Sequence, residues 1–272
     1  MVDLRLGDCL ELMKNIPDGS VDLVLTDPPY GTTQNKWDSI IPFDDMWKEL
    51  HRITKPNSAI VLFSQMPFGA ELIHSNIKEF RYEWVWHKTM PTGFLNANRT
   101  PLRTHENILV FYRKLPTYNP QKWQGKPYSA KSGVTKTNNY GTYKTEHHTD
   151  CADGKRFPVD VVKFNNGNNK DRKHPTQKPI DLLEYLIRTY TNEGEKVLDF
   201  TAGSMSTVIA CINTNRNCIA IEKDEHYFSV GCKRVHDHIL ENNIDLYYNQ
   251  VCGGAYLWQS SKTEQVKDMV GF

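Results

Sequence analysis

Short apolar runs alternate with amphipathic segments along the first 114 residues of the chain. The expected strands are Val21–Thr26, Ile60–Phe63, Trp84–Trp86 and Asn107–Tyr112, and the expected helices lie near Asp44–Ile53 and Ala70–Ile77. Alternation of this kind is typical of a parallel sheet that is covered by helices. This part of the sequence therefore predicts an α/β fold.

The alternation stops after Lys114 and resumes near Ile180. From 115 to about 172 the chain is rich in glycine, proline, asparagine, lysine and aromatic residues, and no regular element is expected there. A polar insert of this length is usually functional or disordered. The elements expected after it are a helix at Ile180–Tyr190, a strand at Lys196–Asp199, a helix from Ser206, a strand at Cys218–Ile221 and a helix at His226–Glu241.

The composition is that of a folded globular protein. Of the 272 residues, 39% are hydrophobic and 24% are charged, as in ordinary domains. No apolar stretch of about 18 residues occurs, and Asp3 and Arg5 stand where a secretory signal needs an apolar run. We therefore expect a cytoplasmic protein with no membrane partner. The six cysteines form no C-x-x-C pair, so neither disulfides nor a metal site are predicted.

Positive charge is concentrated in one region, although the net charge of the chain is only +1. Strictly between Lys114 and Lys178 there are eleven Lys or Arg against five Asp or Glu, interleaved with aromatic residues. This excess suits a polyanionic partner. A solvated loop surface explains it about as well.

The sharpest local signal is Asp27-Pro28-Pro29-Tyr30, directly after the first expected strand. Ligands of open α/β sheets bind beyond the carboxyl ends of strands, which is where this tetrapeptide stands. The two prolines remove two N–H donors, so the carbonyl oxygens and the Asp27 carboxylate are left as acceptors suited to an amino group. The alternative is a proline-rich turn that only ends a strand.

A second signal is Val197-Leu-Asp-Phe-Thr-Ala-Gly-Ser204, an apolar strand that ends in Asp199 and a glycine turn before a helix. Gly203 allows the backbone to approach a ligand closely, and the incomplete G-x-G-x-x-G pattern favours a nucleoside over a dinucleotide. Glu222 ends the next expected strand, 23 positions after Asp199 in the sequence. This spacing is typical of a carboxylate that binds ribose hydroxyls. An ordinary βαβ unit with solvated acids is an equal alternative for this pair.

Two weaker signals flank these motifs. His174-Pro-Thr-Gln-Lys-Pro179 precedes a helix, whose N-terminus together with Lys178 suits an anionic group such as an amino-acid carboxylate. A capped loop with an exposed lysine would look the same. Asp8, after the apolar start of the chain, reads in isolation as a turn or helix-capping residue.

Taken together and in this order, these motifs resemble the DNA amino-methyltransferases, specifically the permuted group called the β class. In that family the tetrapeptide [DNS]-P-P-[YFW] precedes the target-recognition region, and the main cofactor-binding strand comes late in the chain. The resemblance covers about residues 1–240. It implies a Rossmann-like, doubly wound and mostly parallel sheet with an inserted target-recognition region. The implied divisions are a catalytic half at 1–114, the recognition region at 115–172, a cofactor-binding half at 173–245 and a C-terminal segment of unknown role at 246–272.

The resemblance also implies the reaction and its residues. Methyl would pass directly from S-adenosylmethionine to the exocyclic amine of a base flipped out of double-stranded DNA, held by Asp27, Pro28, Pro29 and Tyr30. The cofactor residues implied are Asp8, Cys9, His174, Gln177, Lys178, Asp199, Phe200, Ala202, Gly203, Ser204 and Glu222. Among them, Asp8 would contact the adenine of the cofactor and Glu222 the ribose, with His174, Gln177 and Lys178 near the methionine end. Trp86-His-Lys88 is a weaker match to an aromatic-plus-lysine segment beside the target pocket.

One departure from the family pattern is Met205, where family members have the second glycine of G-S-G-[ST]. If this position needs a positive φ, methionine costs about 1 kcal/mol, and its side chain crowds the cofactor. If it is already the start of a helix, the side chain packs nearby. The sequence does not choose between these two arrangements.

Asp at position 27 favours N6 of adenine over N4 of cytosine within the family, and cytosine stays open. A DNA-binding relative without turnover is the rival in another class, and an RNA or small-molecule methyltransferase is disfavoured by the basic, aromatic insert. The target sequence, a homodimer and a companion restriction endonuclease are left open by the sequence.

Overall fold

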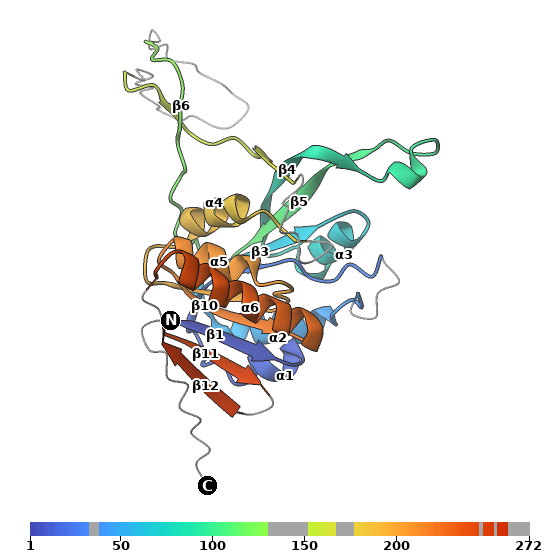
Figure 1. The fold of residues 1–272 in the computed structure, drawn as a ribbon. Coiled ribbons are helices and arrows are strands. Elements are labelled where there is room, and N and C mark those ends of the chain that lie inside the picture. Colours follow the sequence, from blue (N-terminus) through green and yellow to red (C-terminus); the bar gives the residue numbers. More distant parts are fainter. Residues whose placement is uncertain (33–37, 130–151, 167–176, 245–246, 253–254, 261–272) are drawn as a thin grey trace. The chain divides into compact units, whose positions relative to one another are not determined.

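The computed structural model describes residues 1–32, 38–129, 152–166, 177–244, 247–252 and 255–260. Contacts divide the chain into a larger unit, formed by 1–119 and 160–272, and a smaller unit at 120–159. The strands of the larger unit are β1 (Val2–Leu6), β2 (Val21–Thr26), β3 (Thr54–Ser64), β4 (Phe80–Thr92), β5 (Arg103–Phe111), β8 (Val161–Phe164), β9 (Lys196–Asp199), β10 (Asn217–Glu222), β11 (Tyr247–Cys252) and β12 (Ala255–Ser260). They form a ten-stranded sheet in the order β12-β11-β1-β10-β9-β2-β3-β5-β4-β8 (Figure 1).

The centre of this sheet is parallel. β1, β10, β9, β2 and β3 run in one direction, whereas β5 is antiparallel to both β3 and β4. β11 lies parallel to β1, β12 is antiparallel to β11, and β8 is parallel to β4. The near-continuous apolar run of β2 is explained by its central place, because strands with both faces covered bury every side chain.

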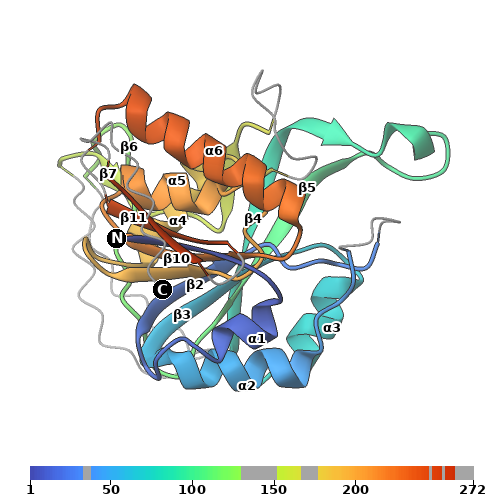
Figure 2. The ribbon, with the colours of Figure 1, turned by 60° about the horizontal axis from the view of Figure 1, so that its bottom comes forward.

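Helices cover both faces of the sheet (Figure 2). They are α1 (Cys9–Met13), α2 (Phe43–Ile53), α3 (Phe68–Ser75), α4 (Ile180–Tyr190), α5 (Ser206–Asn213) and α6 (Glu225–Glu241). One core cluster joins α4, α5 and α6 to the sheet through Leu186, Val208 and Val235. A second joins α1, α2 and α3 to the opposite face, for example through Leu50 and Leu72. The doubly wound, Rossmann-like arrangement predicted from the sequence is confirmed.

The expectation of irregular structure up to Arg172 was wrong at three short strands, β6 (Trp123–Gln124), β7 (Lys155–Arg156) and β8. Val161–Phe164 forms β8, which adds to the sheet beside β4. This strand is short and lies at the sheet edge, with Val161 and Lys163 exposed, so its apolar pattern is weak. The segment after 245 also contains two strands, β11 and β12, which the sequence did not indicate.

The smaller unit, 120–159, contains a two-stranded antiparallel ladder of β6 (Trp123–Gln124) and β7 (Lys155–Arg156). Its described aromatic residues lie beside cations. The Arg156 guanidinium carbon stands 4.9 Å from the centre of the Tyr128 ring and 5.5 Å from that of Trp123. Within the described part of the chain, no helix combines the length and the apolar character needed to cross a bilayer.

Candidate active site

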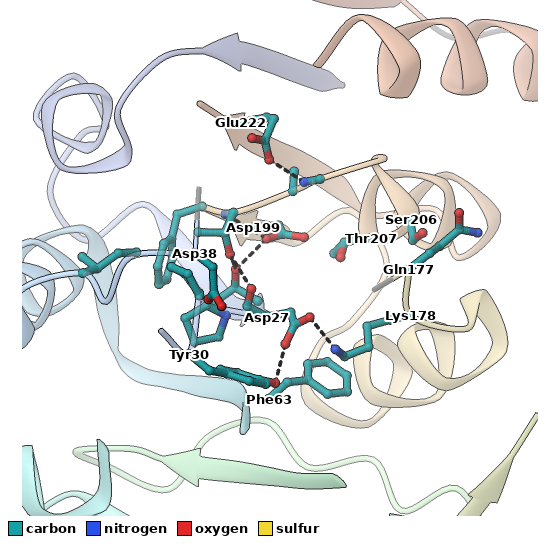
Figure 3. A pocket seen from close by; sticks show the side chains of 18 of the residues that line it. Asp27, Tyr30, Asp38, Phe63, Gln177, Lys178, Asp199, Ser206, Thr207 and Glu222 are labelled. Carbon is teal, nitrogen blue, oxygen red and sulfur yellow. Dashed lines mark hydrogen bonds and ion pairs between the residues drawn. The ribbon is translucent and has the colours of Figure 1, made fainter. Parts of the chain in front are cut away.

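The carboxyl ends of β2, β9 and β10 meet at one edge of the sheet, where parallel α/β sheets bind ligands. A cavity of about 620 Å³ opens there, within the range of about 300–1,000 Å³ for small-molecule sites. Asp27 after β2, Asp199 at the end of β9 and Glu222 at the end of β10 all line it (Figure 3). Three acidic side chains from separate parts of the sequence thus share one hollow.

The cavity brings together almost all of the residues that the sequence singled out. Those that line it are Asp8, Cys9, Asp27, Pro28, Pro29, Tyr30, Gln177, Lys178, Asp199, Phe200, Ala202, Gly203, Ser204 and Glu222. His174 lies outside the described residues. Trp86 and Lys88, the weaker match, also line the cavity.

Asp27 accepts hydrogen bonds from three side chains, at both carboxylate oxygens and at its main-chain carbonyl. Its Oδ1 accepts the hydroxyl of Tyr30 at 2.5 Å, and its Oδ2 accepts the ammonium of Lys178 (Figure 3). The Thr201 hydroxyl donates to its main-chain carbonyl at 3.0 Å. The carboxylate is therefore oriented, and both of its oxygens already have a donor.

Lys178 bridges Asp27 to a second carboxylate, that of Glu106. The Lys178 Nζ lies 3.3 Å from Glu106 Oε2, and Glu106 Oε1 accepts the ammonium of Lys88. Lys88 and Glu106 are both buried. Two ammonium groups and two carboxylates thus balance in a poorly solvated place, as buried charges require.

The charges settle which of these groups are ionised. Burial raises the pKa of Asp27, and the nearby Lys178 ammonium counteracts part of that rise. Burial alone would lower the pKa of Lys178, but the charges of Asp27 and Glu106 outweigh it and raise this pKa. Burial and the Asp27 charge raise the pKa of Tyr30 well above its usual value. At neutral pH Lys178 is therefore a cation and Tyr30 a neutral donor.

The other end of the cavity is built around Glu222. Its Oε2 accepts the backbone N–H of Gly203 at 2.7 Å, and its Oε1 accepts that of Asp224 at 2.8 Å. Asp8 caps α1 by accepting the N–H of Leu10 at 3.0 Å. Both carboxylates thus have fixed positions at the ends of neighbouring strands, β10 and β1.

Asp199 links the carboxyl ends of β9 and β2 at the wall of the cavity. Its Oδ1 accepts the hydroxyl of Thr26 at 2.6 Å and the N–H of Thr201 at 3.2 Å. Burial raises the pKa of Asp199 to about 6. Burial likewise raises the pKa of the Cys9 thiol to about 11, so this side chain is a neutral surface of the cavity.

Met205 has the left-handed backbone conformation that was one of the two arrangements left open by the sequence, with φ 62° and ψ 34°. Its side chain is fully buried. It packs against Gly231 of α6 and is not among the residues that line the cavity. Met205 therefore combines the positive φ of the first alternative with the nearby packing of the second.

Sequence reasoning did not single out Glu106 or Asp38, although both line the cavity. Glu106 stands just before an apolar run, and because β5 is antiparallel to β3 its first residues come to the edge where β3 ends. An acid at the start of an antiparallel strand was therefore the signal. Asp38 accepts the N–H groups of Gly31 and Thr32 at 2.8 and 3.0 Å, in a stretch with no periodic pattern that could have indicated it.

Comparison with known proteins identifies the family of this chain. Residues 21–233 match the N6 and N4 methyltransferase family described as DNA methylase. The type II methyltransferase M.HpaI of Haemophilus parainfluenzae is 28% identical over 86% of this chain and 74% of its own length. M.BglII of Bacillus subtilis, also a type II methyltransferase, is 30% identical over 87% of this chain and 69% of its own.

Among solved structures, the M1.HpyAVI–SAM complex has the same fold. It matches with a TM-score of 0.58 and 24% identity, over 86% of this chain and 100% of that one. The family match spans most of the chain and includes the Asp27–Tyr30 tetrapeptide and the Asp199–Ser204 turn. This protein belongs to the DNA methylase family of N6 and N4 amino-methyltransferases.

Proposed function

We propose that this chain transfers a methyl group from S-adenosylmethionine to the N6 amino group of adenine in double-stranded DNA. The observation that carries the proposal is the pairing of Asp27 with Tyr30 and Lys178 in the cavity that also contains Glu222. An oriented carboxylate suits a base amine, and a strand-end acid beside a glycine turn suits a nucleoside. Asp at position 27 favours adenine within the family, with N4 of cytosine as the alternative.

The residues at the Glu222 end fit the cofactor. Phe200 offers an apolar surface, and Gly203 allows close approach of the backbone. Asp8 offers an acceptor for the adenine and Glu222 one for the ribose hydroxyls. S-Adenosylmethionine, when bound, supplies a methyl group activated by its sulfonium. The chain's contribution there is to bind and orient the cofactor toward Asp27.

At the other end, Asp27 and the carbonyl oxygens around Pro28 and Pro29 would hold the two protons of the target amine. The amine nitrogen is a weak nucleophile because its lone pair is delocalised into the ring, and acceptors on both protons favour its pyramidal form. Each Asp27 oxygen has one side-chain donor in this structure, and a carboxylate oxygen has a second lone pair that can accept an amine proton. Glu106 Oε2, 3.3 Å from the Lys178 Nζ, offers this ammonium a second acceptor beside Asp27.

Single-turnover transfer of labelled methyl to unmethylated genomic DNA tests the proposal. Digestion of the product to nucleosides distinguishes N6-methyladenine from N4-methylcytosine. Asp27→Ala should keep its affinity for S-adenosylmethionine and lose at least a hundredfold in rate, because one well-placed acceptor in a transition state is worth about 2.7–4 kcal/mol. Transfer at the parental rate by Asp27→Ala would contradict the mechanism, and absence of transfer by the parent would contradict the function.

We also propose that residues 115–172 read the DNA sequence. The smaller unit supports this, because Trp123 and Phe157 are exposed and lie near the cations Arg156 and Lys122. Such surfaces suit phosphates and bases. Replacing this segment by that of a relative with another target should change the methylated sequence, and an active hybrid that keeps the original target would contradict the assignment.

The resemblance to type II methyltransferases leads us to propose a cytoplasmic protein with a companion endonuclease of the same specificity. Sequencing of DNA from expressing cells, with detection of modified bases, gives the target. DNA modified in this way should resist an endonuclease that cuts there. Sedimentation of the full chain distinguishes a homodimer from a monomer.

A further inference from the structure

The hairpin of β4 and β5 extends beyond the sheet from the rim of the cavity. Thr92 and Arg103 are paired across the hairpin, and both line the cavity. Residues 93–102 form its tip, which contains the short 3-10 helix η1 (Phe94–Asn96). Figures 1 and 2 both show this tip standing clear of the helices and of the rest of the sheet. The hairpin therefore begins at the proposed base pocket and ends in solvent.

Two adjacent apolar side chains occupy the tip. Leu95 is 102% exposed and Phe94 is 62% exposed. A single exposed apolar side chain is ordinary, but two large ones side by side at the end of a projection suit a partner that covers them. The turn that presents them is internally bonded, because the N–H of Asn96 donates to the carbonyl of Gly93 at 3.0 Å and that of Ala97 to the carbonyl of Phe94 at 3.1 Å.

The tip carries positive and no negative charge. No Asp or Glu occurs from Trp84 to His105, and Arg99, within the tip, and Arg103, at the start of β5, are both exposed. Arg103 is oriented along the rim by its hydrogen bond to the side-chain oxygen of Gln65 at 3.0 Å. An apolar point with cations near it matches the chemistry of a DNA duplex, whose phosphates flank stacked bases.

We propose that Phe94 and Leu95 form a wedge that enters the base stack of the DNA beside the target nucleotide. This inference rests on the proposed function, since a base that enters the cavity leaves a gap in the duplex. Extrusion costs the stacking and pairing of that base, and an apolar side chain that fills the gap offsets part of the cost. Phenylalanine and leucine are among the side chains that proteins insert between base steps.

The test uses the full chain and a duplex with 2-aminopurine at the target position, once sequencing has identified the target. The variant is Phe94→Ser/Leu95→Ser. The matched control is Ile77→Ser/Leu240→Ser, because Ile77 and Leu240 are 60% and 50% exposed and neither lines the cavity. The wedge variant should bind the duplex at least tenfold more weakly and lose most of the fluorescence increase, whereas its calorimetric affinity for S-adenosylmethionine stays within twofold of the parent. The control should behave as the parent.

A mismatch opposite the target separates a wedge from a simple contact. A mispaired base costs less to extrude, so a mismatched duplex should restore most of the fluorescence increase to the wedge variant. Parental DNA affinity and fluorescence in the wedge variant would overturn the inference. Conversion of a dimer to a monomer with fluorescence unchanged would also overturn it, and would identify the tip as a contact between copies. A parent that methylates DNA while the tip variant is equally active contradicts the wedge alone, whereas an inactive parent contradicts the proposed function.

Discussion

The side chain of Met205 occupies the space that a Cβ on Gly231 would need. A methyl group built on Gly231 overlaps the Met205 Cγ and lies 3.2 Å from the carbonyl oxygen of Gly203. Met205 is fully buried and has φ 62°. The absence of a side chain on α6 therefore accommodates the methionine that stands where the family has glycine.

This relationship predicts that the two positions are coupled in stability. Gly231→Ala should cost about 1–3 kcal/mol by overpacking. Met205→Gly should relieve about 1 kcal/mol of backbone strain but lose more than that by leaving a cavity. In the double variant the new methyl fills part of that cavity, so urea unfolding should show a coupling energy of about 0.5–3 kcal/mol. Additive effects of the two changes would show that the contact is unimportant.

The Asp27, Lys178 and Glu106 cluster predicts opposite shifts of the pH–rate profile in two variants. The Lys178 charge lowers the pKa of Asp27 and the Glu106 charge raises it. If transfer needs Asp27 ionised, Lys178→Met should move the acidic limb of the single-turnover rate to higher pH and Glu106→Gln should move it to lower pH. A structural disturbance alone would not give opposite signs, so shifts in the same direction would contradict this account.

Much of the fold could be predicted because its central elements carry strong local patterns. β2, α4 and β9 have the bounds that the sequence predicted, since an apolar run between polar turns marks a buried strand and apolar residues at helical spacing mark a covered helix. β8 was missed because an edge strand with exposed alternate residues has neither pattern.

The site could be predicted only as far as its motifs are continuous in sequence. Asp27 and Lys178 are 151 residues apart, and their ion pair depends on how the sheet brings β2 and the segment before α4 together. The sequence indicated that each suits a polar ligand but not that they contact each other. Glu106 was missed for the same reason, because its place at the cavity follows from the antiparallel direction of β5.

The buried carboxylate of Asp199 predicts a stability that falls as the pH rises. Its pKa is raised from 3.8 to about 6 by burial, so the native state binds more protons than the unfolded state between these values. This contribution is therefore lost as the pH rises from about 4 through 6, and a difference of about two pK units corresponds to about 3 kcal/mol.

Asp199→Asn should remove this pH dependence. In urea unfolding without cofactor, the free energy of unfolding of the variant minus that of the parent should be larger at pH 7.5 than at pH 4.5. Asp181→Asn, at an exposed position of α4, is the matched control and should follow the parent. An Asp199→Asn variant that keeps the parental pH dependence would show that Asp199 is ionised without cost in the native protein.

Two substitutions at Glu222 distinguish the role of its two acceptor oxygens from that of its size. Both of its oxygens accept backbone N–H groups, from Gly203 and Asp224. Glutamine has a single acceptor oxygen, so Glu222→Gln would turn an NH₂ group toward one of these donors and disturb the glycine turn. If the remaining lone pairs of Glu222 bind the ribose, Glu222→Ala and Glu222→Gln should both weaken S-adenosylmethionine at least tenfold in calorimetry, which is about 1.4 kcal/mol. Glu225→Ala, the exposed glutamate that begins α6, should bind as the parent does. Parental affinity in Glu222→Gln, with loss only in Glu222→Ala, would mean that the side chain fills space at the turn without accepting from the cofactor.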